Sequence, residues 1–167
     1  MYTLAAAAAV IDPMNSVARV ATFRTWLARG IIRYSETDQA PARAGVAGLL
    51  SRHRVIQLAI AAQLVDLGLP PKEAADVAVA FSDTAAPPRF PGILFPTGET
   101  TLCVWREASG EIRRRVLNHA ATDGLDRIRQ LLGGAKPLTE ALIVIDCRAV
   151  LHGLEALIGS NSEGDVL

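Results

Sequence analysis

The chain has 167 residues and half of them are apolar, which suffices for one domain with a real core or for two small ones. The formal net charge is zero with histidine neutral, which excludes a general attraction of the whole chain to nucleic acid. The charge is uneven, because residues 1–72 carry eight Lys/Arg and four Asp/Glu, and residues 73–167 carry nine and thirteen. A first half of net +4 beside a second half of net −4 suits a nucleic-acid-binding head joined to a solvated partner domain.

Cysteine content and hydropathy indicate a cytoplasmic protein without a membrane segment. Cys103 and Cys147 form no CxxC pair, and two thiols do not make a disulfide framework, so a reducing compartment is expected. A secretory signal carries a positive residue before its apolar run, and no such residue precedes Leu4–Ile11. The run is also far too short to span a bilayer.

Residues 1–33 predict two helices. The alanine-rich run Leu4–Ile11 favours a helix that ends at Asp12, because the residue before a proline is pushed out of helical geometry. Asn15 or Ser16 can cap the next helix, and Gly30 stops it. One apolar face of that second helix is formed by Val20, Phe23, Trp26 and Leu27.

A polar loop precedes two further helices. Val46–Leu50 is a short apolar run that can form a strand, and Ser51 can cap a helix that extends to Asp66. On this helix we expect an apolar stripe formed by Val55, Leu58, Ala59, Ala62 and Val65. Pro71 suits the first turn of a fourth helix, which is expected to end near Phe81.

A proline-rich stretch at residues 83–91 is predicted to be a stiff linker between two domains, 1–82 and 92–159. Beyond it we expect strands at 101–106 and 112–117, a helix at 122–132, a strand at 141–145, a helix at 150–158 and a flexible tail at 160–167. The basic run Arg113–Arg115 falls in a predicted strand, where a charged, solvated edge is the favoured interpretation. The expected fold class is α+β, with a mainly helical N-terminal domain and a small α+β C-terminal domain.

Residues 2–80 resemble the DNA-binding domain of the MerR family of transcription regulators, a winged helix-turn-helix. The segments that carry the resemblance are Tyr2-Thr3-Leu4, Thr22-Phe23-Arg24-Thr25-Trp26, Gly30-Ile31-Ile32, Leu67-Gly68-Leu69 and Lys72-Glu73-Ala74. In that order, the first three are similar to the start of the family's first helix, to its recognition helix, and to the glycine and aliphatic pair before its wing. The last two together are similar to its closing helical turn. The resemblance implies a helical DNA-binding head with Phe23 and Trp26 in its core and Arg24 facing DNA.

Nine residues are candidates for DNA contact on this basis. Arg24 can bond guanine or a phosphate with two parallel bonds, and the alternative is a solvated arginine on a surface helix. Arg52 and Arg54 open a helix whose N-terminal amides also favour phosphate. The other candidates are Arg19, Thr22, Thr25, Arg29, Arg33 and Arg43.

The chain departs from the family in three places. Asp12–Arg19 occupies what is normally a tight turn between the first two helices. Ala47 and Gly48 stand where the wing usually carries a Tyr-Arg pair, so Arg43 is the candidate for wing contact with phosphate. The proline-rich stretch replaces the long dimerising coiled coil.

Catalytic and metal sites have little support in the sequence. Cys147 follows Asp146, and His152 lies five residues on, but a nucleophile needs a base within hydrogen-bond reach, and a buried inert thiol is the favoured interpretation. The three histidines and two cysteines are scattered rather than closely spaced, so no metal site is predicted. We expect no enzyme activity and no cofactor, and the sequence identifies no small-molecule effector.

The leading hypothesis is a sequence-specific regulator of double-stranded DNA that acts as a homodimer through residues 92–159. Its candidate pairing surface is an apolar stripe of the last helix, formed by Val150, Leu154, Leu157 and Ile158, which could equally cover the strand at 141–145. Two alternatives remain open: an excisionase-like or architectural DNA binder, and an adaptor that binds protein rather than DNA.

Overall fold

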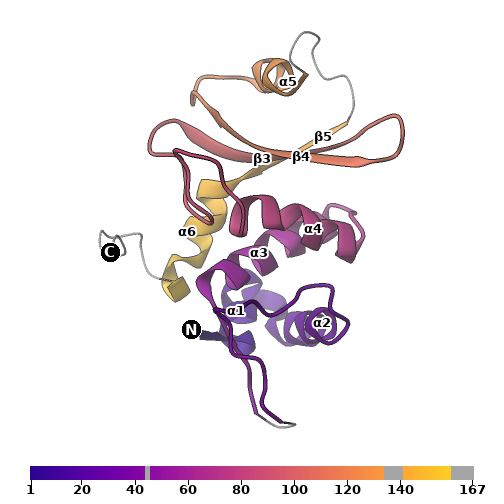
Figure 1. Ribbon diagram of the computed structural model, residues 1–167, viewed down its shortest axis with the longest axis vertical. Coiled ribbons are helices and arrows are strands. Elements are labelled where there is room, and N and C mark those ends of the chain that lie inside the picture. Colours follow the sequence, from indigo (N-terminus) through magenta and orange to yellow (C-terminus); the bar gives the residue numbers. More distant parts are fainter. Residues whose placement is uncertain (44–45, 134–140, 159–167) are drawn as a thin grey trace. The chain divides into compact units, whose positions relative to one another are not determined.

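A computed structural model describes residues 1–43, 46–133 and 141–158, and Figure 1 shows their course. The α+β class is confirmed, with a helical N-terminal part followed by an α+β C-terminal part. The chain forms two compact units: unit 1 is residues 1–78 with the last helix from Ala149 onward, and unit 2 is residues 79–148. This grouping differs from the predicted division at 83–91, and the predicted tail at 160–167 lies outside the described residues.

Unit 1 is built around helices. Its elements in chain order are β1 (Tyr2–Thr3), α1 (Leu4–Ile11), a 3-10 turn (Pro13–Asn15), α2 (Ser16–Ala28), β2 (Leu49–Leu50), α3 (Arg52–Asp66), the start of α4 (Pro71–Ser82) and most of α6 (Cys147–Ile158). β1 and β2 pair antiparallel, with Tyr2 opposite Leu50. The pairing ties the start of the chain to the residues just before α3, and the predicted strand Val46–Leu50 shortens to its last two residues.

Local chemistry sets the helix starts in unit 1. The Thr3 hydroxyl accepts from the Ala6 amide and caps α1, and the Asp12 carboxylate accepts from the Asn15 amide and caps the 3-10 turn. Asn15 precedes α2 but its side chain bonds Asp12 instead of the helix, so its predicted capping role is wrong. The interval Asp12–Arg19 is therefore a four-residue turn followed by the first four residues of α2.

The predicted limits of α3 are confirmed, and of the residues in its predicted stripe Val55, Leu58, Ala59 and Ala62 are buried while Val65 is half-buried. The Ser51 hydroxyl accepts from the Arg54 amide at 3.3 Å and caps the helix as expected. Every residue from Arg54 to Ala62 is buried, so α3 is a central helix rather than an amphipathic surface helix. On α2, Phe23 and Trp26 are buried with ring centroids 5.4 Å apart, as predicted.

Unit 2 holds a three-stranded antiparallel sheet in the order β4-β3-β5, covered on one face by α5 (Figure 1). Its elements are β3 (Glu99–Arg106), β4 (Ile112–His119), α5 (Leu125–Gly133) and β5 (Leu142–Asp146). Between the sheet and α5 lie Cys103, Leu117, Ile128, Trp105, Leu131, Leu132 and Leu142. Leu125 is the first residue of α5 and is 52% exposed.

The basic run on β4 lies where the sequence suggests. β4 is an edge of the sheet among the described strands, and Arg113, Arg114 and Arg115 are exposed. Arg113 pairs with Glu107 at 2.9 Å and with Glu111 at 3.1 Å, across the hairpin that joins β3 to β4. The run is thus a charged edge that discourages pairing with another chain, as interpreted from the sequence.

The proline-rich stretch, predicted to be a stiff linker, is exposed at residues 84–88 but folds around the buried side chain of Arg89, which is 5% exposed. The guanidinium stacks on Phe81, 5.1 Å from the ring centroid, and burial lowers its pKa. Its two terminal nitrogens donate to the main-chain oxygens of Ala80, Phe81, Thr84, Phe90 and Ile93. Arg89 thereby satisfies carbonyls at the end of α4 that the helix itself leaves unpaired.

Replacement of Arg89 should destabilise the chain strongly. Arg89→Met keeps a long apolar side chain but removes the donors, so buried and part-buried carbonyls lose a hydrogen bond, and we expect a loss of about 3 kcal/mol in the free energy of unfolding. The measurement is urea denaturation followed by circular dichroism. Arg114→Met, at an exposed arginine of the same unit, is the matched control and should change stability little; equal losses in both variants would contradict the role of Arg89.

Candidate nucleic-acid interface

The outer face of α2 carries three of the candidate residues. Arg24 is exposed on the side of the helix opposite Phe23 and Trp26, as predicted, and has no acidic partner among the described residues. Thr22 and Thr25 lie beside it, and their hydroxyls donate to helix carbonyls, those of Ala18 at 3.0 Å and Ala21 at 2.9 Å. Both hydroxyl protons are therefore used inside the helix, which leaves oxygen lone pairs and methyl groups for an outside partner.

Two further cations follow the end of α2. Arg29 closes the helix, and Arg33 follows the turn at Gly30, whose φ of +65° is a left-handed conformation that favours glycine. Ile32 of the same turn is 1% exposed and anchors it in the core. Arg29 and Arg33 are both exposed, so the turn presents positive charge next to that of α2.

A hairpin-like segment between Gln39 and Leu49 follows the turn (Figure 1). The two residues exchange main-chain hydrogen bonds of 2.8 Å in each direction, which closes the base of the segment. A Cβ at Gly48 would lie 2.8 Å from the Tyr34 hydroxyl and 2.9 Å from the Gln39 oxygen, so only glycine fits there. Arg43 is exposed on this segment, as a wing contact would require.

An open groove lies between α2 and the hairpin-like segment. It has a volume of about 650 Å³, and among its described lining residues are Arg24, Leu27 and Ala28 from α2 and Arg43 and Val46 from the segment. Two predicted DNA-contacting arginines from separate parts of the chain therefore face one depression.

Arg19 is engaged internally. Its Nε lies 2.9 Å from Asp12 Oδ2, and its Nη2 bonds Asp66 Oδ2, so one guanidinium joins the turn after α1 to the end of α3. Burial lowers the pKa of Arg19, but the bonds to Asp66 and Asp12 outweigh it and raise the pKa overall. The positive charge of Arg19 is thus balanced by two carboxylates, and we remove this residue from the candidate DNA surface.

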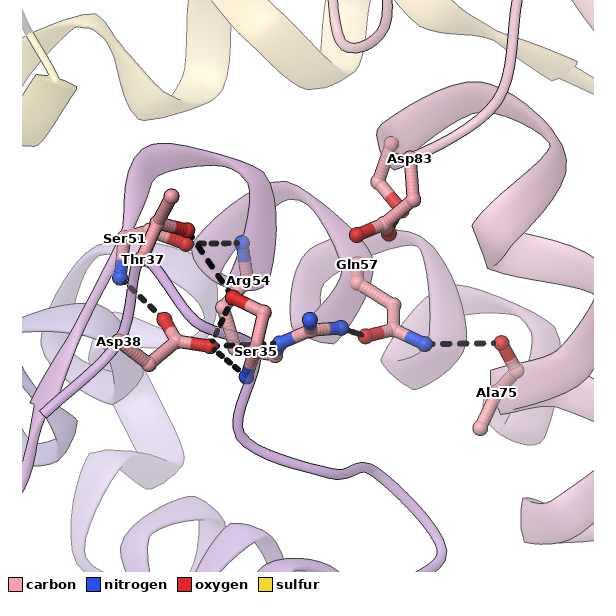
Figure 2. A network of polar contacts seen from close by, with 9 residues as sticks. Ser35, Thr37, Asp38, Ser51, Arg54, Gln57, Ala75 and Asp83 are labelled. Atoms are coloured by element: carbon pink, nitrogen blue, oxygen red, sulfur yellow. Dashed lines mark hydrogen bonds and ion pairs between the residues drawn. The ribbon is translucent and has the colours of Figure 1, made fainter. Parts of the chain in front are cut away.

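Arg54 is also engaged internally. It is 6% exposed, its Nε lies 3.2 Å from Asp38 Oδ2, and its Nη1 bonds the Gln57 side-chain oxygen. Gln57 in turn donates to the Ala75 carbonyl at 3.1 Å, which links α3 to α4 (Figure 2). Arg54 therefore organises the interior, and we remove it from the candidate surface as well. Arg52, at the start of α3, is half-buried, and burial lowers the pKa of its guanidinium.

Asp38 is the residue at the centre of this network, and the sequence analysis missed it. Its side chain is fully buried; Oδ1 accepts from the Ser51 amide at 2.6 Å, and Oδ2 accepts from the Ser35 amide at 2.6 Å and the Ser35 hydroxyl at 2.7 Å (Figure 2). Burial raises the pKa of Asp38, but the hydrogen bonds from Ser51 and Ser35 outweigh it and lower the pKa to about 2. The Ser-x-x-Asp spacing of Ser35 and Asp38 in a polar loop is the one sequence signal for it.

After these internal pairs are removed, the exposed charge of α2 and the loop that follows is strongly one-sided. Among the described residues from Ser16 to Leu50, the exposed charges are those of Arg24, Arg29, Arg33, Arg43 and Glu36. Four cations and one carboxylate leave a local charge of +3 on a chain whose formal net charge is zero.

The environment of the two thiols disfavours their charged, nucleophilic form. Cys103 and Cys147 are both buried; burial raises the pKa of each thiol, that of Cys147 to about 12. His152, the base considered in the sequence, bonds Glu155 through Nδ1 at 3.0 Å. Within the described part of the chain, no group of three or more His, Cys, Asp or Glu is placed to hold a metal, and no helix is long and apolar enough to cross a membrane.

Comparison of the sequence with models of known protein families and with curated proteins finds no match.

Replacement of Asp38 should destabilise the chain in a pH-dependent manner. Asp38→Asn keeps the shape but removes the carboxylate that pairs with the buried Arg54, and breaking such a buried pair costs about 3–5 kcal/mol. The pKa of Asp38 in the folded protein is about 2, below its ordinary value of 3.8. Asp38 therefore contributes its full stabilisation to the folded state at pH values above 3.8, and this stabilisation is lost as the pH falls toward 2.

Urea denaturation from neutral pH down to about pH 2 measures both effects. The stability difference between the parent protein and Asp38→Asn should be full at neutral pH and should narrow in acid. Glu36→Gln, at an exposed carboxylate in the same loop, is the control and should change little. A difference that does not vary with pH would mean that Asp38 is not the titrating group.

Proposed function

We propose that the protein is a sequence-specific regulator that binds double-stranded DNA through α2 and the described residues of the hairpin-like segment, 39–43 and 46–49. The observation that carries the proposal is the exposed charge from Ser16 to Leu50, four arginines against one carboxylate. Positive charge gathered on one helix and the loop beside it is typical of a surface that follows the DNA backbone. The resemblance of residues 2–80 to the MerR family supports the same proposal.

The order of elements in unit 1 adds support. A short strand, two helices, a hairpin-like segment and two further helices follow one another, which is the order implied by a winged helix-turn-helix. An α-helix fits the major groove, where an arginine can form two bonds with guanine. Arg24 is the candidate for base contact in this arrangement, with Thr22 and Thr25 beside it, while Arg29, Arg33 and Arg43 are candidates for phosphate contact.

The internal ion pairs of the remaining candidates favour a different role for them. Arg19 and Arg54 pair with carboxylates that join α2, α3 and the loop before α3, so we propose that they support the surface rather than contact DNA. Arg52 stays a candidate at the N-terminus of α3, where main-chain amides favour phosphate.

We also propose that the protein acts as a homodimer, since one helix-turn-helix contacts few phosphates and such heads usually act in pairs. The stripe of α6 does not supply the pairing surface, because Val150 and Leu154 are already buried within the chain and Leu157 and Ile158 are half-buried. Within residues 92–159 the described large apolar side chains that remain exposed are Ile93, Leu125 and Val144. We therefore place the pairing surface among these residues.

Replacement of Arg24 should weaken specific DNA binding without unfolding the protein. Arg24→Ala removes one base contact, which is worth about 1–3 kcal/mol, and the exposed position predicts little change in thermal stability. The probe is a duplex selected by the full-length protein from a random library, with affinity measured at several salt concentrations. Arg114→Ala, at an exposed arginine on β4, is the control and should bind like the parent.

Two results would count against this assignment. Equal affinity of Arg24→Ala and the parent for the selected duplex would remove Arg24 from the interface. Failure of the parent to bind any duplex in a salt-dependent manner would overturn the proposal of DNA binding and favour a protein-binding adaptor.

Light scattering on the full-length protein tests the homodimer. We expect twice the chain mass, and we expect Leu125→Glu with Val144→Glu to yield the monomer mass, because buried charge at an apolar interface is costly. A monomeric parent would contradict the homodimer, and a dimer that survives both substitutions would place the pairing surface elsewhere.

A further inference from the structure

The groove between α2 and the hairpin-like segment combines two kinds of surface. Its walls are mainly aliphatic, with Leu4 from α1, Val20 and Leu27 from α2 and Val46 from the segment. Arg24 and Arg43 also line it, one from each side. Its volume of about 650 Å³ lies within the range of sites that hold small organic ligands.

The charge of the groove is not balanced by its own residues. Of the described residues that line it, none is Asp or Glu, and neither arginine has an acidic partner in the described part of the chain. A DNA phosphate would satisfy the arginines but would leave the aliphatic walls uncovered. The complementary ligand is an anion attached to an apolar body, since burial of apolar surface and pairing of charge are then both achieved.

We propose that this groove binds a medium-chain aliphatic carboxylate, with the carboxylate between Arg24 and Arg43 and the alkyl chain against Leu4, Val20, Leu27 and Val46. Each arginine presents a planar pair of donors that matches carboxylate geometry. The walls carry methyl groups, and Tyr34 is the only aromatic residue among the described lining residues, which favours an alkyl chain over a stacked ring.

The ligand site has a regulatory consequence that rests on the proposed DNA binding. Arg24 and Arg43 belong to both surfaces, so a bound carboxylate occupies two of the four exposed arginines from Ser16 to Leu50 and offsets one unit of their positive charge. Carboxylate and DNA should therefore compete, and by linkage each should weaken the affinity for the other by the same factor.

The test uses decanoate below its micellar concentration and calorimetric titration of the full-length protein. We expect saturable binding of decanoate and much weaker binding of decanol, which has the same chain without the charge. Arg24→Gln and Arg43→Gln should each weaken decanoate binding about tenfold, the usual worth of one charged hydrogen-bonding partner. Ala28→Leu, at an exposed position that lines the groove, should also weaken binding because it fills the groove and leaves both arginines in place.

Arg114→Gln, on an exposed strand edge of unit 2, is the matched control and should bind decanoate like the parent. Absence of saturable decanoate binding, or equal affinity for decanol, would overturn the proposal. Equal losses in Arg114→Gln and the two groove variants would also overturn it, because attraction would then be general rather than local.

A competition assay on the selected duplex separates this inference from the proposed function. Displacement of the duplex by decanoate supports both. Decanoate binding without displacement supports the ligand site and overturns its regulatory role. Decanoate binding by a protein that binds no duplex supports the ligand site and overturns DNA binding alone.

Discussion

The carboxylate of Asp38 is the contact on which the geometry of unit 1 depends. It lies fully buried and receives hydrogen bonds from Ser35, Ser51 and Arg54, so it joins the loop after α2 to the first residues of α3. Ser51 caps α3 through its hydroxyl while its amide bonds Asp38. A buried charge is costly unless it is fully paired, and each donor here comes from a segment that must be folded for the network to exist.

Two networks of internal ion pairs determine which charges stay exposed on the surface proposed to bind DNA. In the first, the buried carboxylate of Asp38 accepts hydrogen bonds from its neighbours. In the second, Arg19 pairs with Asp12 and Asp66. Both remove charge from the surface by pairing it inside the unit. The positive charge that remains exposed on unit 1 therefore depends on these internal pairs as well as on the number of arginines in the sequence.

The sequence predicts helix limits well where local chemistry determines them. Ser51 and Pro71 act on their immediate neighbours, so α3 and the start of α4 lie close to the expected residues. The burial of α3 on all sides was not predictable from its own pattern, because it depends on which elements surround the helix.

The candidate site was predicted less completely, for a similar reason. Arg19 and Arg54 resemble Arg24 in the sequence, but their acidic partners lie as far as 47 residues away along the chain, and only the folded structure brings them together. Arg24, Arg29, Arg33 and Arg43 are exposed as expected, and none of them pairs with a carboxylate of the described residues. Asp38 was overlooked because a single aspartate in a polar loop has the composition of a solvated turn.

The loop around Arg89 has a consequence for how the chain can vary. All five hydrogen bonds of that guanidinium end on main-chain oxygens, and an oxygen of the backbone is present whatever side chain the residue carries. The fold of the loop is therefore encoded mainly in one side chain and in the backbone of its neighbours. Ala80, Thr84 and Ile93 contribute only their backbone oxygens to this contact, whereas position 89 needs a side chain with a branched set of donors to keep all five bonds.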